Sequence, residues 1–147
     1  MRSKQLSENL EKVRASINIY SSKKVRLIAV SKKFPIEDIN CLIDNGHLEF
    51  GENYIQEALE KIKKINNNKV KWHYIGRIQS NKIGKIVDNF DWLHTLSDLN
   101  HAEKIQKNLE KSKNKINALV QLNIDNDPAI GGIILEDLDN FIKELKN

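Results

Sequence analysis

Short apolar runs alternate with amphipathic segments along this chain. Leu6, Leu10, Val13 and Ile17 recur at spacings of four, three and four residues, which predicts an amphipathic helix over residues 4–19. Further helices are predicted over residues 36–44, 54–65, 81–88, 98–111 and 135–145, and Gly46 is expected to stop the first of these. Strands are predicted over residues 25–31, 47–51, 70–75, 91–95 and 116–124.

This order of elements predicts an α/β fold with a parallel sheet, because each helix must carry the chain back across a face of the sheet before the next strand. A (β/α)8 barrel of TIM type and an open doubly wound sheet both satisfy the pattern. The helix before the first strand favours the barrel, whose base it can cover. Five strands cannot close such a barrel, so we expect residues 1–147 to form either an open sheet or one barrel domain truncated after about five βα units. Its first and fifth strands would then have unpaired edges.

The first predicted strand ends on a lysine, Lys32, with Pro35 in the turn that follows. A lysine at the mouth of a strand loses part of the hydration that favours its ammonium form, which makes its amine a usable nucleophile. The alternative is an ordinary surface lysine, since the chain has 24 Lys and Arg residues. Lys32 is nevertheless the first candidate for chemistry.

Polar side chains also follow the next two predicted strands. Asn53, after the second strand, offers both a donor and an acceptor to a ligand, or caps the following helix. His73 and Asn81 flank the end of the third strand; His73 is alternatively a hydrogen-bonded core histidine, and Ser80 or Asn81 a helix cap. Because parallel-sheet proteins bind ligands at the carboxyl ends of their strands, these groups are expected to converge on one site.

Other polar positions point less clearly to chemistry. His94, Thr95 and Asn123 lie on the fourth and fifth strands and face either a ligand or neighbouring backbone. The histidines lack metal-ligand spacing, so we predict no metal. The glycine motifs typical of dinucleotide sites, P-loops and nucleophile elbows are missing from the sequence, and Gly131-Gly132 is interpreted as a flexible loop.

Composition limits the expected binding partners and cellular compartment of the protein. The net charge of +4 is spread over 24 basic and 20 acidic residues without an arginine-rich block, which makes nucleic-acid binding a weak alternative. The single cysteine, Cys41, cannot form an intramolecular disulfide, which fits a reducing, cytoplasmic location. Neither a signal peptide nor a membrane span is indicated, so we expect a soluble protein.

Four motifs occur in order along the chain: Ala29–Lys32, Phe50–Glu57, Trp72–Lys82 and His94–Thr95. Together they resemble those of the pyridoxal phosphate homeostasis proteins of the YggS/PROSC type. Because several long motifs occur at the family's intervals, the resemblance is specific, and it runs from about residue 6 to the end of the chain.

The resemblance implies a fold like the barrel domain of alanine racemase, with pyridoxal 5'-phosphate (PLP) held as a Schiff base on Lys32. It further implies that Asn53, His73, Ile75 and Asn81 lie near the cofactor. Proteins of this type resemble cofactor carriers without turnover, which serve intracellular PLP homeostasis and deliver the cofactor to PLP-dependent apoenzymes. Complete relatives are expected to be monomers, whereas this shorter chain is expected to self-associate through its sheet edges.

Two departures from the family pattern bear on these expectations. Family members continue through strands six to eight, which carry the loops expected to hold the phosphate. Ile130 stands where the family usually has a lysine, which reduces the positive charge near the cofactor. Two alternatives therefore stay open: a racemase-like enzyme that uses Lys32 and the cofactor's electron sink, and a non-binding remnant or half of a split protein.

Overall fold

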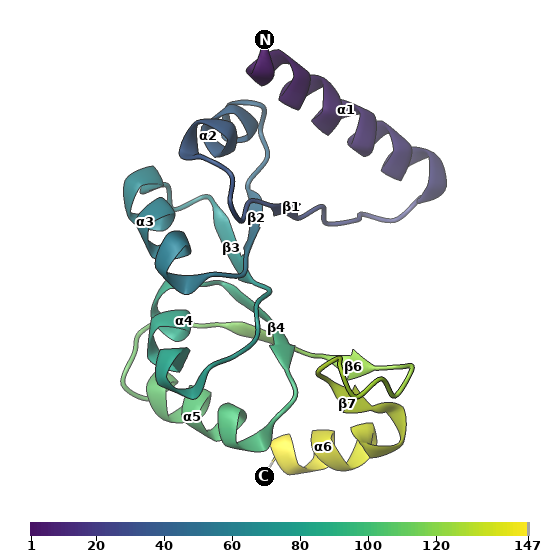
Figure 1. The fold of residues 1–147 in the computed structure, drawn as a ribbon, viewed down its shortest axis with the longest axis vertical. Coiled ribbons are helices and arrows are strands. Elements are labelled where there is room, and N and C mark those ends of the chain that lie inside the picture. Colours follow the sequence, from purple (N-terminus) through teal and green to yellow (C-terminus); the bar gives the residue numbers. More distant parts are fainter. Residues whose placement is uncertain (147) are drawn as a thin grey trace.

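Five parallel strands form one sheet in chain order. The computed structural model describes residues 1–146, and in it the strand order is β1-β2-β3-β4-β5 (Figure 1). Every neighbouring pair is parallel. The strands are β1 (Ala29–Val30), β2 (Glu49–Glu52), β3 (Lys71–Tyr74), β4 (Trp92–Leu96) and β5 (Asn117–Val120). The prediction of a parallel α/β sheet is therefore confirmed.

Helices connect these strands. The connections are α2 (Ile36–Asp44), α3 (Ile55–Ile65), the short 3-10 helix η1 (Ser80–Lys82) with α4 (Ile83–Asn89), and α5 (Leu99–Leu109). All four α-helices lie on one side of the sheet, left in Figure 1. The N-terminal helix α1 (Arg2–Tyr20) packs against α2. Helices on a single side of an ordered parallel sheet are the arrangement of a barrel wall and not of a doubly wound sheet.

The hydrophobic core lies between the sheet and these helices. Phe50 and Leu93 have exposed fractions of 0%, and Trp72 and Tyr74 of 4% and 3%. Because side chains alternate along a strand, the residues between them occupy the opposite face of the sheet. We call this second face the inner face. It carries Gly51, His73 and Trp92, and the register pairs His73 with each of the other two.

The first predicted strand is much shorter than expected. Ala29 pairs with Phe50, so residues 25–27 fall before the first residue of β2 and have no strand beside them. In the described residues, β1 and β5 each pair with one strand only, which leaves both edges of the sheet open.

The prediction of a single strand over 116–124 is wrong. β5 ends at Val120, and β6 (Leu122–Asn123) pairs instead with β7 (Ile133–Ile134) in a separate two-stranded sheet. The loop between them is folded back, because the Asn123 side-chain amide donates to the backbone oxygens of Asp127 (2.8 Å) and Ile130 (3.1 Å). Asn123 thus satisfies neighbouring backbone, the alternative left open for it.

The chain then continues into η2 (Leu135–Asp137) and α6 (Leu138–Leu145), which packs against α5. In residues 1–146, no helix has both the length and the apolar character needed to cross a membrane.

Candidate functional site at the carboxyl edge of the sheet

Lys32, Asn53 and Ile75 lie at one level of the sheet, just beyond the carboxyl ends of β1, β2 and β3. The printed register pairs Val30 with Gly51 and Glu52 with Tyr74. The bonds from Ser31 N–H to the Gly51 oxygen and from Ile75 N–H to the Glu52 oxygen, each 2.9 Å, belong to these two pairs. The same register, continued two residues past the first pair and one past the second, places Lys32 beside Asn53 and Asn53 beside Ile75. Three of the five predicted site residues therefore share one edge of the sheet.

Lys32 occupies the second position of a tight turn. The Phe34 N–H donates to the Ser31 oxygen at 3.1 Å, which closes the turn over residues 31–34. Lys33 has a φ of 64°, a left-handed conformation that costs energy for any residue with a Cβ. Lys32 itself is half-buried. The structure therefore presents this lysine at a fixed bend at the end of β1.

A buried cluster of charged groups surrounds the backbone of this turn. The Lys61 ammonium donates to the Ser31 oxygen (2.7 Å), to Glu52 Oε1 (2.8 Å) and to Glu57 Oε1 (2.6 Å). The Ser31 hydroxyl also donates to Glu52 Oε1, at 2.7 Å. We call Ser31, Glu52, Glu57 and Lys61 the turn cluster.

Asn53 presents an acceptor without a partner. Its Oδ1 is buried and accepts no hydrogen bond from any described residue. The N-cap of α3 is Tyr54, without a side-chain cap bond, so the alternative in which Asn53 caps this helix is wrong. The Asn53 backbone oxygen lies so close to Gly76 that a Cβ at position 76 would overlap it. The amide of Asn53 is therefore placed by close backbone packing and has capacity for a ligand.

A cavity of about 390 Å³ adjoins this asparagine. Asn53, Tyr54, Tyr74, Arg77 and Lys82 contribute to its lining, which contains two cations and no carboxylate. A second cavity, of about 490 Å³, is lined in part by Ile75, His101 and Ile130. Lys32 lines neither of these two cavities. The two cations suit an anionic group of a ligand, and the open amide oxygen suits a hydrogen-bond donor.

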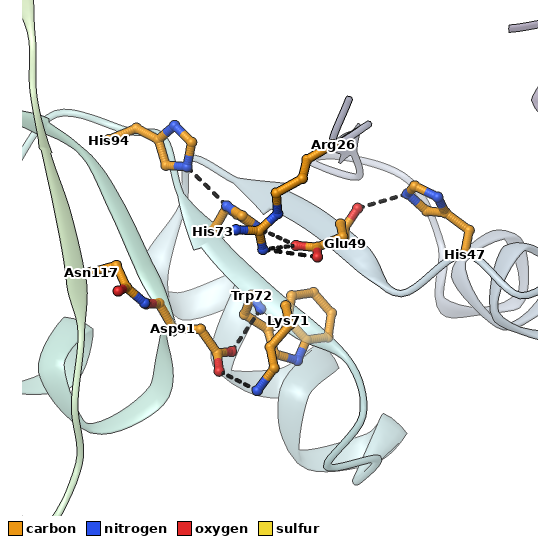
Figure 2. Close-up of polar contacts among 9 residues, drawn as sticks. All are labelled: Arg26, His47, Glu49, Lys71, Trp72, His73, Asp91, His94 and Asn117. Carbon is orange, nitrogen blue, oxygen red and sulfur yellow. Dashed lines mark hydrogen bonds and ion pairs between the residues drawn. The ribbon is translucent and has the colours of Figure 1, made fainter. Parts of the chain in front are cut away.

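His73 lies within β3 and belongs to a hydrogen-bonded chain on the inner face. Figure 2 shows His73 between Glu49 and His94: His73 Nε2 is 2.6 Å from Glu49 Oε2, and His73 Nδ1 is 2.9 Å from His94 Nε2. Arg26 donates to both Glu49 oxygens at 2.8 and 2.9 Å and stacks 4.5 Å from the centroid of the Trp92 ring. With 1% exposure, His73 is a hydrogen-bonded buried histidine, the alternative left open for it.

Burial and hydrogen bonding set the protonation states in this chain. Burial raises the pKa of Glu49, but hydrogen bonds from His73 and Arg26 outweigh it and hold the pKa below its usual range. Burial lowers the pKa of His73 by more than its bond to Glu49 raises it. Burial, with the charges of His73 and Arg26, also lowers the pKa of His94. The two imidazoles are therefore neutral at pH 7 beside an ionised carboxylate.

The remaining predicted residue, Asn81, is exposed in η1 and lines neither cavity described above. Neither Ser80 nor Asn81 makes a side-chain cap bond to η1 or α4, so the capping alternative is wrong for both. The Ser80 hydroxyl oxygen instead lies 3.1 Å from His101 Nε2, within hydrogen-bond distance. The proximity of His73 and Asn81 to a cofactor stays a prediction.

Sequence reasoning missed Arg26, Glu49 and Lys61. The signal for Lys61 was its position four residues after Glu57 in a predicted helix, a spacing that pairs opposite charges. Arg26 and Glu49 lie far apart in sequence and gave no local signal. The described residues contain no group of three or more His, Cys, Asp or Glu side chains that could hold a metal ion.

These features define a parallel βα sheet of the barrel-wall type, with a candidate ligand site at its carboxyl edge. The family model described as "Alanine racemase, N-terminal domain" matches residues 1–147, so the chain belongs to this family. The fold expected from the motifs is thereby confirmed.

Several relatives have the name expected from the motifs. The chain is 40% identical over 129 residues to the pyridoxal phosphate homeostasis protein of Buchnera aphidicola subsp. Schizaphis graminum, covering 87% of this chain and 56% of that protein. It is 34% identical over 145 residues to the protein of that name from Escherichia coli K12, covering 92% of this chain and 62% of the relative. The chain therefore spans a little more than half the length of these relatives.

Solved structures agree with this relationship. PipY of Synechococcus elongatus, a COG0325 family member solved with PLP bound, superposes with a TM-score of 0.86 at 29% identity, covering 97% of this chain and 64% of PipY. Alanine racemase of Clostridium difficile superposes with a TM-score of 0.70 at 15% identity, covering 93% of this chain and 36% of the enzyme. The second likeness concerns the fold alone.

Proposed function

We propose that this chain binds PLP as a Schiff base on Lys32, without turnover, and contributes to intracellular PLP homeostasis. The observation that carries the proposal is the common level of Lys32, Asn53 and Ile75 at the carboxyl edge of the sheet. An aldehyde that condenses with the Lys32 amine would meet Asn53 and Ile75 beside it.

The cofactor supplies an aldehyde for this reversible condensation and a phosphate for binding. In this chain, Lys32 would hold the aldehyde, and the open Asn53 Oδ1 would accept a hydrogen bond from the ligand. Arg77 and Lys82 place positive charge in the cavity next to Asn53, which suits a phosphate. Both the PLP-bound PipY structure and the names of the relatives support this choice of ligand.

Absorbance titration with PLP tests the binding proposal. Lys32→Arg keeps the positive charge but removes the amine nucleophile, and Lys33→Arg is the matched control one position along. We expect wild type and Lys33→Arg to show the saturable absorbance change of imine formation, and Lys32→Arg to lack it. An equal change in all three proteins would contradict the proposal.

The absence of turnover is a separate part of the proposal. A racemase-like enzyme is the second candidate because the family includes alanine racemase domains. Incubation with PLP and single enantiomers of amino acids, followed by chiral chromatography, separates the two functions. We expect no racemisation, whereas racemisation by wild type that is lost in Lys32→Arg would establish the enzyme. Transfer of bound PLP to a PLP-dependent apoenzyme tests the carrier role.

A further inference from the structure

The turn cluster contains a buried lysine, Lys61, whose ammonium contacts the turn that carries Lys32. Lys61 has an exposed fraction of 5% and Glu52 of 0%. Burial of ions is costly unless every charge is paired, and a hydrophobic replacement often stabilises a fold at least as well. Stability alone does not explain this cluster, the more so because Glu52 Oε2 is buried and has no hydrogen-bond partner among the described residues.

All three protons of the Lys61 ammonium are used within the cluster. Their acceptors are the Ser31 backbone oxygen and one carboxylate oxygen each from Glu52 and Glu57, at 2.6 to 2.8 Å. The Lys61 side chain is only 6% exposed, so with all three donors engaged its amine is closed to a ligand. Lys61 is therefore unsuited to react with an aldehyde.

The same cluster holds the backbone on both sides of Lys32. Before it, the Ser31 oxygen accepts from Lys61 and the Ser31 hydroxyl donates to Glu52. After it, the Lys33 N–H donates to Glu57 Oε1 at 2.7 Å. This second bond fixes the residue with the left-handed φ of 64°. A turn bound at both ends leaves Lys32 little backbone freedom.

Charge reinforces the bond to Lys33. Burial raises the pKa of Glu57, but hydrogen bonds from Lys61 and the Lys33 backbone outweigh it and hold the pKa below its usual range. An ionised acceptor makes a stronger hydrogen bond to an amide than a neutral one does. Lys61 thus links Glu52, which contacts Ser31 at the start of the turn, to Glu57, which contacts Lys33 near its end.

We propose that Lys61 and Glu57 are positioning residues, which fix the turn over residues 31–34 and thereby direct the Lys32 amine, and that Lys61 is not a second PLP-binding lysine. The proposal rests on the function proposed for Lys32. Reaction rates depend steeply on the placement of the reacting groups. Loosening the turn should therefore slow condensation at Lys32 even where the fold is kept.

Glu57→Ala tests this proposal, because its partly exposed side chain permits substitution with less risk to folding than the buried Lys61. Glu57→Gln keeps an oxygen acceptor for Lys33 N–H, and Glu60→Ala is the matched control, an exposed acid on the same helix. The first readout is the rate of PLP labelling at Lys32, trapped with borohydride and mapped by mass spectrometry. We expect about a tenfold loss of the labelling rate for Glu57→Ala, a smaller loss for Glu57→Gln, whose neutral acceptor binds the amide more weakly, and no change for Glu60→Ala.

Amide hydrogen exchange in the protein without PLP gives the second readout. We expect Glu57→Ala to lose protection at the Lys33 and Phe34 amides while α3 stays protected. Unchanged exchange and labelling in Glu57→Ala, or an adduct on Lys61 in wild type, would overturn the proposal. If wild type forms no adduct at Lys32, the proposed function fails, and the exchange data still decide whether the cluster holds the turn.

Discussion

His73 Nε2 lies 2.6 Å from Glu49 Oε2, inside the strand that leads to the candidate site. Because Glu49 is ionised and also accepts from Arg26, it can only accept from His73, so the His73 proton must be on Nε2. His73 Nδ1 is then an acceptor, which requires the proton of His94 on Nε2. One carboxylate thus sets the tautomers of two imidazoles.

This tautomer chain is a direct prediction. We expect two-dimensional 15N–1H NMR of the histidine rings to show protonated Nε2 on both His73 and His94 at neutral pH. In Glu49→Ala, the constraint on His73 is removed and a mixture of tautomers should appear. Protonated Nδ1 on His73 in wild type would contradict the assignment.

Three histidines with lowered pKa values predict how stability depends on pH. Burial lowers the pKa of His47, His73 and His94 below the value of 6.5. As pH falls through 6.5, the unfolded chain therefore binds protons before the folded chain does, and the free energy of unfolding decreases. Urea unfolding above and below this pH should show the loss, with a smaller slope in His73→Gln. Stability that rises on acidification would refute the sign.

Position 76 is predicted to require glycine because a side chain would clash with Asn53, and not because the backbone there has an unusual conformation. A Cβ there would overlap the Asn53 backbone oxygen, so Gly76→Ala must displace the segment that holds the open amide. We expect a loss of about 1–3 kcal/mol in the free energy of unfolding. Gly131→Ala is the control, because its Cβ would meet nothing nearer than 3.9 Å. Equal stabilities of the two variants would show that the close approach is not as described.

The open sheet edges predict self-association. Leu119 on β5 is 43% exposed, and β5 pairs only with β4 in the described residues. Exposed edge strands pair readily with other chains, and a charge on the edge suppresses this. Sedimentation velocity at increasing concentration should show oligomers that Leu119→Lys reduces. Leu135→Lys, at a 64% exposed leucine off the sheet, should not reduce them. Association unchanged in Leu119→Lys would exclude this edge as the contact.

Periodicity predicted most elements because each crossover helix has one apolar face against the sheet. The helix over 36–44 agrees with α2, and Gly46 ends it with a φ of 72°. β1 could not be delimited from its apolar run, since its length depends on where β2 begins. The split after Val120 and the pairing of β6 with β7 also depend on distant partners.

In the candidate site, too, the sequence predicted the residues at strand ends but not the contacts between distant segments. Strand ends identified Lys32 and Asn53, because parallel strands bring their carboxyl ends to one edge. The turn cluster joins Ser31 to Lys61 across 30 positions of sequence, and only Glu57 and Lys61 have local spacing. His73 had chemistry that fitted a ligand site, but its position inside β3 and its two ring partners could be known only from the folded chain.

The central claim is that one amine, that of Lys32, condenses with PLP. Borohydride reduction of the protein equilibrated with PLP, followed by peptide mapping, tests it most directly, because reduction makes the adduct permanent at its site. We predict one dominant adduct on the peptide that contains Lys32 and its loss in Lys32→Arg. Labelling spread over the surface lysines, or unchanged in Lys32→Arg, would contradict the claim.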